Sequence, residues 1–175
     1  MEYGNFGKIH VRNLRNYDPE IFAREEVRQG WLYASPEKLE NRLRDNVTGK
    51  AISIAADYDG VPAGYVSVYP YCMWGAFGGK GYAEIVDFNV LEKFRRKGVG
   101  TVLLDVAEKI AAEYSDTVYL GVGLHSGYGS AQRLYVKRGY VPDGSGVWYG
   151  DKVCNPYSAC VNDDDLVLYL SKKLT

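Results

Sequence analysis

The sequence predicts an α/β (α+β) fold, in which a mixed and mostly antiparallel central sheet carries helices on both faces. Three observations indicate this fold. Two adjacent strand-like runs flank a hairpin signal, later strand-like runs are separated by helical patterns, and the βα repeats are too few for a doubly wound nucleotide fold. The 175 residues contain no internal repeat or linker, so we expect residues 1–175 to form a single domain.

The first part of the chain is predicted to hold a short strand and two helices. Residues 9–14 have the composition of a strand. A helix is expected from Asp18 to about Gln29, because an aspartate followed by proline is a helix start and a glycine follows its end. A second helix is expected over 36–46, with Ser35 as its N-cap and a proline in the first helical position.

The centre of the chain is predicted to be rich in strands. The runs 51–57 and 61–69 flank the tetrapeptide DYDG, which is typical of a hairpin. A loop of glycine and aromatic residues follows over 69–80, and 82–91 is the longest strand candidate. From Gly98 onward, apolar residues recur at intervals of three and four, which predicts a helix with one buried face. The expected face consists of Val99, Val102, Leu103, Val106, Ala107, Ile110 and Tyr114.

The last part of the chain is predicted to alternate between strand and helix before it becomes irregular. Residues 117–124 form a buried type of strand, and 130–138 form a shorter helix. A strand begins at 140–142, an irregular segment follows over 143–165, and 166–174 closes the chain as a strand.

The composition limits the classes of partner. Lys plus Arg number 21 against 22 Asp plus Glu, and a net charge of −1 favours neither nucleic acid nor an anionic membrane as a partner. No apolar run approaches the length of a membrane span. The odd number of cysteines, Cys72, Cys154 and Cys160, indicates free thiols, and we expect a cytoplasmic protein. Their spacing matches no zinc pattern, so we expect no metal.

The stretch FRRKGVGT at 94–101 has the pattern of an anion site. Three cations precede two glycines and the start of the predicted helix. A helix N-terminus offers unpaired amide hydrogens and partial positive charge, and glycine lets an anion approach the backbone without meeting a Cβ. The stretch is not a dinucleotide fingerprint, because Leu103 stands where a third glycine is required, and no Gly-Lys-Ser/Thr makes it a P-loop. Taken alone, it is equally consistent with a solvated turn.

A second motif connects this stretch with a known family. The run from Arg95 to Gly100 fits the Q/R-x-x-G-x-G/A signature of the GCN5-related N-acetyltransferases, the GNAT superfamily. About 35 residues later, the run from Ala131 to Tyr140 fits the second recurring pattern of that family, A-x-x-L-Y-x-K-x-G-F. The sequence therefore resembles this superfamily over about residues 82–142.

The resemblance implies that acetyl-CoA is the ligand and co-substrate. The pantetheine arm would pair with the backbone of Phe88 and Val90, where the family's sheet is splayed at the acetyl-CoA cleft. Many relatives have an asparagine where this chain has Tyr128, and Ser130 is expected to replace its contact with the coenzyme. The residues expected around the diphosphate are Arg95, Arg96, Lys97, Gly98, Val99, Gly100 and Thr101.

Two residues are predicted to catalyse acetyl transfer. An amine with a pKa near ~10.4 is charged at neutral pH and must lose a proton to become a nucleophile. Glu84 matches the catalytic glutamate of the histone-acetyltransferase branch and is the predicted base, with Asp87 or a water chain as alternatives. Tyr135 matches the family's tyrosine beside the coenzyme sulfur and is the predicted acid. The structural alternatives are an exposed carboxylate for Glu84 and an apolar helix face for Tyr135.

The acceptor site is predicted to lie among loops, where the sequence is least informative. Asp87 is a candidate for contact with the acceptor amine from a curved strand, although alternation places it on the opposite sheet face from Glu84. Tyr71 and Trp74, with Tyr69 and Phe77, are expected to wall an aromatic pocket.

The sequence supports three functions. The first is an N-acetyltransferase in which a primary amine, of a small molecule or a peptide, attacks acetyl-CoA directly in a ternary complex. The alternatives are a noncatalytic acyl-CoA-binding module and an acyltransferase for a longer acyl-CoA. A homodimer is compatible with each of them.

Overall fold

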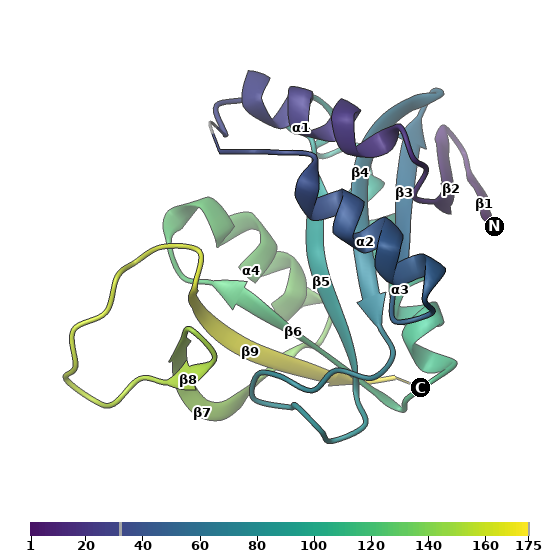
Figure 1. The fold of residues 1–175 in the computed structure, drawn as a ribbon. Helices are drawn as coiled ribbons and strands as arrows, with labels where there is room; N and C mark the ends of the chain where they lie inside the picture. Colours follow the sequence, from purple (N-terminus) through teal and green to yellow (C-terminus); the bar gives the residue numbers. More distant parts are fainter. Residues whose placement is uncertain (32, 175) are drawn as a thin grey trace. The chain divides into compact units, whose positions relative to one another are not determined.

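A computed structural model describes residues 1–31 and 33–174, and the chain forms two compact units. The first, here called the N-terminal unit, consists of Met1–Pro70 and Ile85–Ile110. The second, the C-terminal unit, consists of Tyr71–Glu84 and Ala111–Thr175. The hydrogen-bonded strand order is β1-β2-β3-β4-β5-β6-β9-β7-β8, which confirms the predicted mixed and mostly antiparallel sheet (Figure 1).

The strands of the N-terminal unit follow one another as an antiparallel meander. They are β1 (Glu2–Phe6), β2 (Ile9–Asn13), β3 (Ile52–Tyr58) and β4 (Val61–Tyr69), followed by most of β5 (Ala83–Val90). The β3–β4 hairpin turns at Asp59 and Gly60, which have φ values of 48° and 79°. Positive φ at both positions matches the twist of the flanking strands, so the DYDG signal is confirmed.

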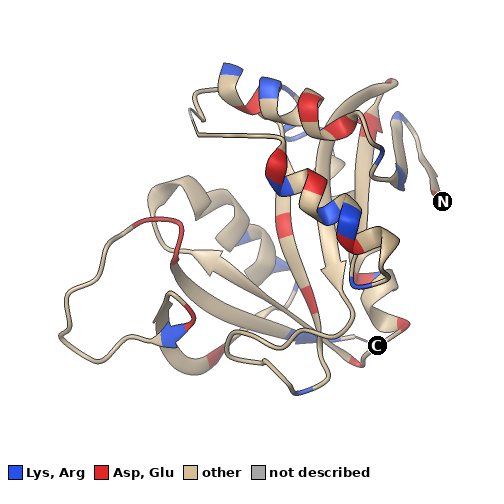
Figure 2. Ribbon diagram, viewed as in Figure 1, with Lys and Arg blue, Asp and Glu red and all other residues tan. Residues whose placement is uncertain are grey.

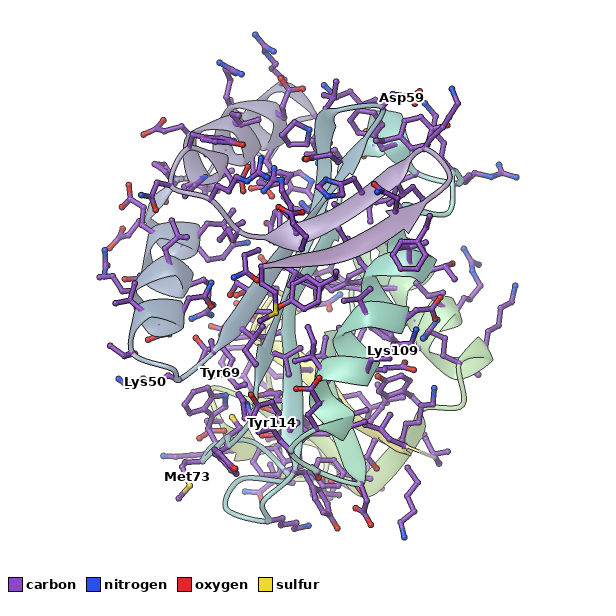
Figure 3. All side chains as sticks on the ribbon, turned by 90° about the vertical axis from the view of Figure 1, so that its right-hand side faces the viewer. Lys50, Asp59, Tyr69, Met73, Lys109 and Tyr114 are labelled. Carbon is purple, nitrogen blue, oxygen red and sulfur yellow. The ribbon has the colours of Figure 1, made fainter. Side chains whose placement is uncertain are left out.

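Helices cover both faces of the sheet in the N-terminal unit. Helices α1 (Asp18–Arg28) and α2 (Glu37–Val47) lie on one face, and α3 (Val99–Ala112) lies on the other (Figure 3). Alternation along β4 explains this arrangement, since Tyr65 bonds residues of α1 and α2 while Gly64 faces Leu103 of α3. A Cβ at Gly64 would lie 2.6 Å from the carbonyl oxygen of Asn89, which is why β4 and β5 can approach so closely there.

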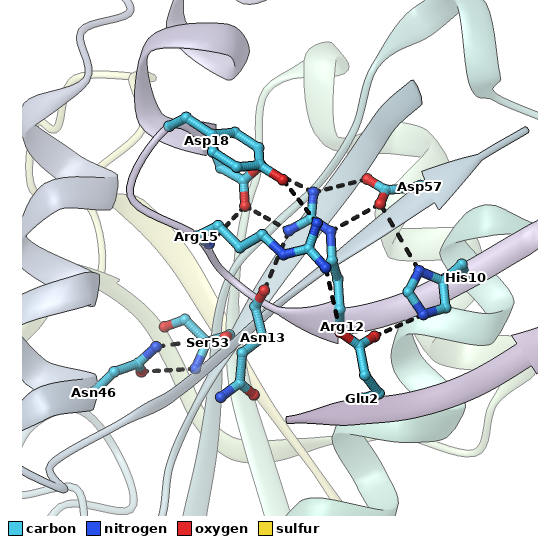
Figure 4. Close-up of polar contacts among 10 residues, drawn as sticks. Glu2, His10, Arg12, Asn13, Arg15, Asp18, Asn46, Ser53 and Asp57 are labelled. Atoms are coloured by element: carbon cyan, nitrogen blue, oxygen red, sulfur yellow. Dashed lines mark hydrogen bonds and ion pairs between the residues drawn. The ribbon is translucent and has the colours of Figure 1, made fainter. Parts of the chain in front are cut away.

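A buried arginine joins β2, β3 and the start of α1. The side chain of Arg12 is 1% exposed and donates two hydrogen bonds to each of the carboxylates of Asp18 and Asp57, at 2.6–3.0 Å (Figure 4). Burial acts to lower the pKa of Arg12, but the bonds to the two carboxylates outweigh it and raise that pKa. Arg12 therefore stays charged at neutral pH, and the three side chains of this triad depend on one another.

The C-terminal unit contains the rest of the sheet and one α-helix of the described residues. Its elements are β6 (Thr117–Gly123), the 3-10 turn η2 (Ser126–Tyr128), α4 (Gly129–Lys137), β7 (Val141–Tyr149), β8 (Lys152–Val153) and β9 (Leu166–Lys173). The other 3-10 turn, η1 (Glu92–Phe94), belongs to the N-terminal unit. Strand β6 pairs with β9 in antiparallel register and with the first two residues of β5 in parallel register.

Tyr169 on β9 organises the aromatic core of this unit. Its ring lies 5.4 Å from that of Trp148 and 6.2 Å from that of Tyr119. A Cβ built at Gly75 would lie 2.5 Å from the Tyr169 ring, and one at Gly121 would lie 3.3 Å from it. Both glycines therefore make room for the same phenol.

Two predictions about the elements are wrong, and one strand was not predicted. Ser35 is not the N-cap of α2, because the helix begins one residue later with Pro36 at that position and no side-chain cap. The segment 143–165 is not irregular throughout, since β7 continues to Tyr149 and β8 follows. Gly144 and Gly146 have positive φ and shift the register between β7 and β9, so the strand was hidden by its glycines. Strand β1 was not anticipated.

Replacing Arg12 by methionine is expected to lower the free energy of unfolding by about 3–5 kcal/mol, because two carboxylates would stay buried without their cation. Urea denaturation of Arg12→Met and wild type measures this. Lys8→Met is the matched control, since Lys8 pairs with Asp59 at 2.8 Å on the surface and its loss should change little. Equal stability of the two variants would contradict the structural role of the triad.

Candidate active site

Strand β5 carries four of the predicted site residues. Glu84 is 3% exposed, in the C-terminal unit, and Asp87, Phe88 and Val90 follow in the N-terminal unit. The backbone at Asp87 has a φ of 54°, so the strand departs from its extended course there. Asp87 therefore does not follow the simple alternation expected from the sequence.

The glycine turn, residues 95–100, leads from η1 into α3. Arg96 and Gly98 both have positive φ, 61° and 86°, and α3 begins at Val99. The left-handed backbone conformation at Gly98 would be strained for a residue with a side chain. No acidic residue occupies the first turn of α3, so its N-terminal amides face no local anion of their own helix.

The three cations of the turn are exposed, and two of them have partners. Arg95 donates to Glu92 at 3.2 Å and to the carbonyl oxygen of Val90 at 3.3 Å. The ammonium group of Lys97 lies over the rings of Tyr58 and Phe94, at 5.1 and 5.4 Å. The charges of Arg95 and Lys97 lie beside the glycine turn, and both side chains would have to rotate to contact a ligand.

Close packing explains why residue 100 is a glycine, in addition to the predicted access for an anion. A Cβ at this position would lie 3.1 Å from the ring of Phe88 and 3.5 Å from the side chain of Val90. The absence of a side chain therefore lets the first turn of α3 pack closely on β5. Access for an anion, which the sequence suggested, is not required to explain this glycine.

Glu84 belongs to a buried polar cluster in the C-terminal unit. The thiol of Cys72 donates to its carboxylate at 2.6 Å, and the phenol of Tyr119 donates to the carbonyl oxygen of Trp74 at 3.1 Å. Burial, followed by the hydrogen bond to Glu84, raises the pKa of the Cys72 thiol to about 12. Glu84 is thus not the exposed carboxylate of the structural alternative considered above.

Tyr135 is buried on α4. Its exposure is 5%, and its ring lies 5.8 Å from that of Tyr140. Burial raises the pKa of Tyr135, with a smaller contribution from Tyr128. The phenol therefore keeps its proton at neutral pH. Ser130, in the first turn of the same helix, is exposed.

A model of the acetyltransferase (GNAT) family matches residues 17–140, more than half of the chain. The chain belongs to this family. The matched range includes β5, the glycine turn and Tyr135, so both motifs lie inside it. A search of curated proteins found no match.

Solved structures show the GNAT fold over nearly the full chain. Ard1 from Thermoplasma volcanium is 21% identical with a TM-score of 0.69, and the match covers 97% of this chain and 99% of that one. yncA from Salmonella typhimurium, with its cofactor acetyl-CoA, is 14% identical with a TM-score of 0.66, over 97% and 95%. PaiA N-acetyltransferase from Thermoplasma acidophilum, in complex with coenzyme A, is 18% identical with a TM-score of 0.66, over 95% and 99%.

The candidate acceptor residues of this GNAT chain are distributed over both units. In the N-terminal unit, Arg42 of α2 donates to Asp87 at 2.5 Å and to the phenol of Tyr69 at 2.7 Å, and that phenol donates to Asp45. Tyr69 is buried and bonded, so it is not the free pocket wall that the sequence suggested. Arg42 was missed, because 45 residues separate it from Asp87.

The aromatic loop of the C-terminal unit divides into buried and exposed residues. Phe77 is buried, with its ring 5.0 Å from that of Tyr119. Tyr71 and Trp74 are 70% and 46% exposed, so both present part of their surface to solvent. Cys72, between them in sequence, was not singled out as a site residue, and a cysteine inside an aromatic loop gives no signal of its carboxylate partner.

His125 and the aspartates near β9 form a surface cluster in the same unit. The His125 ring contacts Asp164 at 3.0 Å and accepts a hydrogen bond from the amide of Gly127 at 3.1 Å. Asp163 accepts from Tyr149, and Asp163–Asp165 form an acidic segment of the ribbon before β9 (Figure 2). These bonds join η2 to the segment that leads into β9.

Within the described residues, 1–31 and 33–174, neither a membrane-spanning helix nor a metal-binding cluster is found. None of their helices has the length and apolarity that a membrane crossing requires. None of their histidine, cysteine, aspartate and glutamate side chains form a group of three or more that is suited to hold a metal ion.

Cys72 is expected to resist thiol reagents in the native protein, whereas the exposed Cys160 reacts rapidly, because Cys72 is 1% exposed and protonated. Timed titration with a chromogenic disulfide reagent, with and without denaturant, measures this. The raised pKa also implies stability that is present below pH 9, the ordinary value, and lost as pH rises toward about 12. Rapid native reaction of a Cys154→Ser/Cys160→Ser variant would contradict the burial.

Proposed function

We propose that this GNAT chain transfers the acetyl group of acetyl-CoA to a primary amine of a small molecule, peptide or protein, by direct attack in a ternary complex. The observation that carries the proposal is the family match across two independent motifs, one containing the left-handed Gly98 directly before a helix and the other containing the buried Tyr135. The fold neighbours that contain acetyl-CoA and coenzyme A support the choice of donor.

The proposed role of the glycine turn is to bind the diphosphate of the coenzyme. Gly98 turns the chain so that the first amides of the 14-residue helix α3 are presented together, and these amides carry partial positive charge. Arg96 is exposed beside them and adds a full charge. The pantetheine arm would bond to the backbone of Phe88 and Val90. Ser130 would supply a further contact.

The proposed chemistry requires one proton to leave the amine and one to reach the thiolate. Glu84 is the proposed base, acting directly or through water, because it matches the family's catalytic glutamate and its carboxylate accepts a hydrogen bond from the neutral thiol of Cys72. Tyr135 is the proposed acid, because burial keeps its phenol protonated until a more basic thiolate develops. The backbone amide of Phe88 or Val90 would stabilise the oxyanion.

The proposed acceptor is a small amine. Asp87, held by Arg42 and 16% exposed, offers a carboxylate to an ammonium group. Tyr71 and Trp74 offer exposed aromatic faces, which attract cations.

A noncatalytic acyl-CoA-binding module is the second candidate. The burial of Glu84, at 3% exposure, favours it, because a base must reach the amine or a water molecule next to it. An acyltransferase for a longer acyl-CoA would be distinguished by stronger thermal stabilisation with that thioester than with acetyl-CoA.

Tyr135→Phe is expected to lower the rate of thiol release from acetyl-CoA by about 10²–10⁴-fold with a responsive amine, while binding of the coenzyme is retained. The reason is that phenylalanine keeps the ring but removes the proton donor. A thiol-detecting assay on an amine panel measures turnover, and calorimetry measures binding. Tyr140→Phe, which alters the neighbouring ring, is the matched control. Tight coenzyme binding without turnover by the wild type would favour the module instead.

Gly98→Ala is expected to weaken acetyl-CoA binding by about tenfold or more, because a Cβ at φ 86° strains the turn by roughly 1–2 kcal/mol and displaces its amides. Thermal shift with increasing acetyl-CoA measures the affinity. Gly7→Ala is the control, since Gly7 has a φ of 63° with open space around it, so it introduces comparable strain elsewhere. Equal coenzyme affinity in both variants would exclude the turn as the diphosphate site.

A further inference from the structure

The Cys72–Glu84 contact is a buried hydrogen bond between two chemically active groups. Cys72 and Glu84 are 1% and 3% exposed, and the sulfur lies 2.6 Å from Oε2 of the carboxylate. A thiol is a weak donor, and a carboxylate accepts hydrogen bonds strongly when it is ionised. The contact therefore matches a protonated thiol that donates to an ionised Glu84.

The fold of the 70–82 loop determines where this thiol lies. The amide of Gly79 donates to the carbonyl oxygen of Cys72 at 3.1 Å, which closes a turn behind the cysteine. The amide of Gly75 donates to Asp151 at 2.7 Å, and Gly75 packs against the Tyr169 ring. The loop is thus attached to the rest of the C-terminal unit by specific contacts, and the thiol is part of a fixed arrangement.

Two neutral phenols lie beside this contact. They belong to Tyr119 of β6 and Tyr169 of β9, while Cys72 comes from the 70–82 loop. Burial raises the pKa of both tyrosines, with a further contribution from the charge of Glu84, so both keep their protons at neutral pH. The thiol of Cys72 donates directly to the carboxylate.

We propose that Cys72 is a positioning residue for Glu84, whose thiol holds one carboxylate oxygen and favours the ionised form that can accept a proton. The inference rests on the proposed function of Glu84 as the base. A donor to a carboxylate stabilises the charged state, so its loss makes the carboxylate harder to ionise. Cys72 itself contacts no reacting atom in this scheme and undergoes no covalent change.

The pH dependence of kcat/KM tests the proposal in the full-length protein with acetyl-CoA and a responsive amine. In Cys72→Ala we expect the acid limb of the profile to move to higher pH by about one unit, because one hydrogen bond to a charged group is lost. Cys72→Ser should restore the limb, because its hydroxyl donates in place of the thiol. Cys160→Ala, which removes an exposed cysteine, should leave the profile unchanged.

The outcomes separate this inference from the proposed function. Full activity of Glu84→Gln would remove Glu84 as the base, and the proposed mechanism would fail with the inference. Loss of activity in Glu84→Gln with an unmoved acid limb in Cys72→Ala would overturn the inference alone. An equal shift in Cys72→Ser and Cys72→Ala would also overturn it, because donation would not be the cause.

A spectroscopic measurement tests the contact without removing the cysteine. In a Cys154→Ser/Cys160→Ser background, Cys72 is the one thiol left in the sequence. Its infrared S–H stretching band should lie at lower frequency than that of a free thiol, because donation weakens the S–H bond. Adding Glu84→Gln should move the band toward the free value, since a neutral amide accepts less strongly. If the band of the variant that retains Glu84 lay at the frequency of a free thiol, the proposal would be contradicted.

Discussion

The course of strand β5 is the constraint on which both groups of candidate residues depend. Its first two residues, Ala83 and Glu84, are fixed by pairing with Val118 and Tyr119 of β6. Three residues later the backbone adopts a left-handed conformation at Asp87, which costs a non-glycine residue about 1–2 kcal/mol. The ion pair with Arg42 holds Asp87 in that conformation. Local strain of this kind is kept where the surroundings over-determine it, and it is common at functional sites.

The two buried charged clusters are built on opposite principles. Arg12 is matched by two carboxylates that occupy its donors, so its charge serves to join elements of the fold. Glu84 instead accepts a hydrogen bond from the thiol of Cys72 and lies near the phenol of Tyr119. The first arrangement is suited to stability and the second to proton transfer, because a base must retain a charge that a proton can neutralise.

The sequence was informative where structure depends on local chemistry. The DYDG hairpin and most of the buried face of α3 follow from residue types at close spacing and were predicted, but Tyr114 was wrongly assigned to that face, since it is 40% exposed and lies beyond the end of the helix. Contacts made through folded loops were not predictable. Cys72 meets Glu84 because the intervening loop folds back, and Arg42 meets Asp87 across 45 residues. The continuation of β7 beyond Pro142 was missed for a different reason, since glycines at 144 and 146 interrupt its pairing pattern while both of its ends pair with β9.

The phenol of Tyr169 ties two distant positions to one another. Because its ring fills the space where side chains would project from Gly75 and Gly121, a methyl group at Gly75 would force the phenol to shift, and one at Gly121 would press tightly against the ring. A relative with a small residue at the position of Tyr169 would be free to vary at both. These three positions should consequently change together during divergence, and their joint variation would record how the aromatic loop was repacked in each lineage.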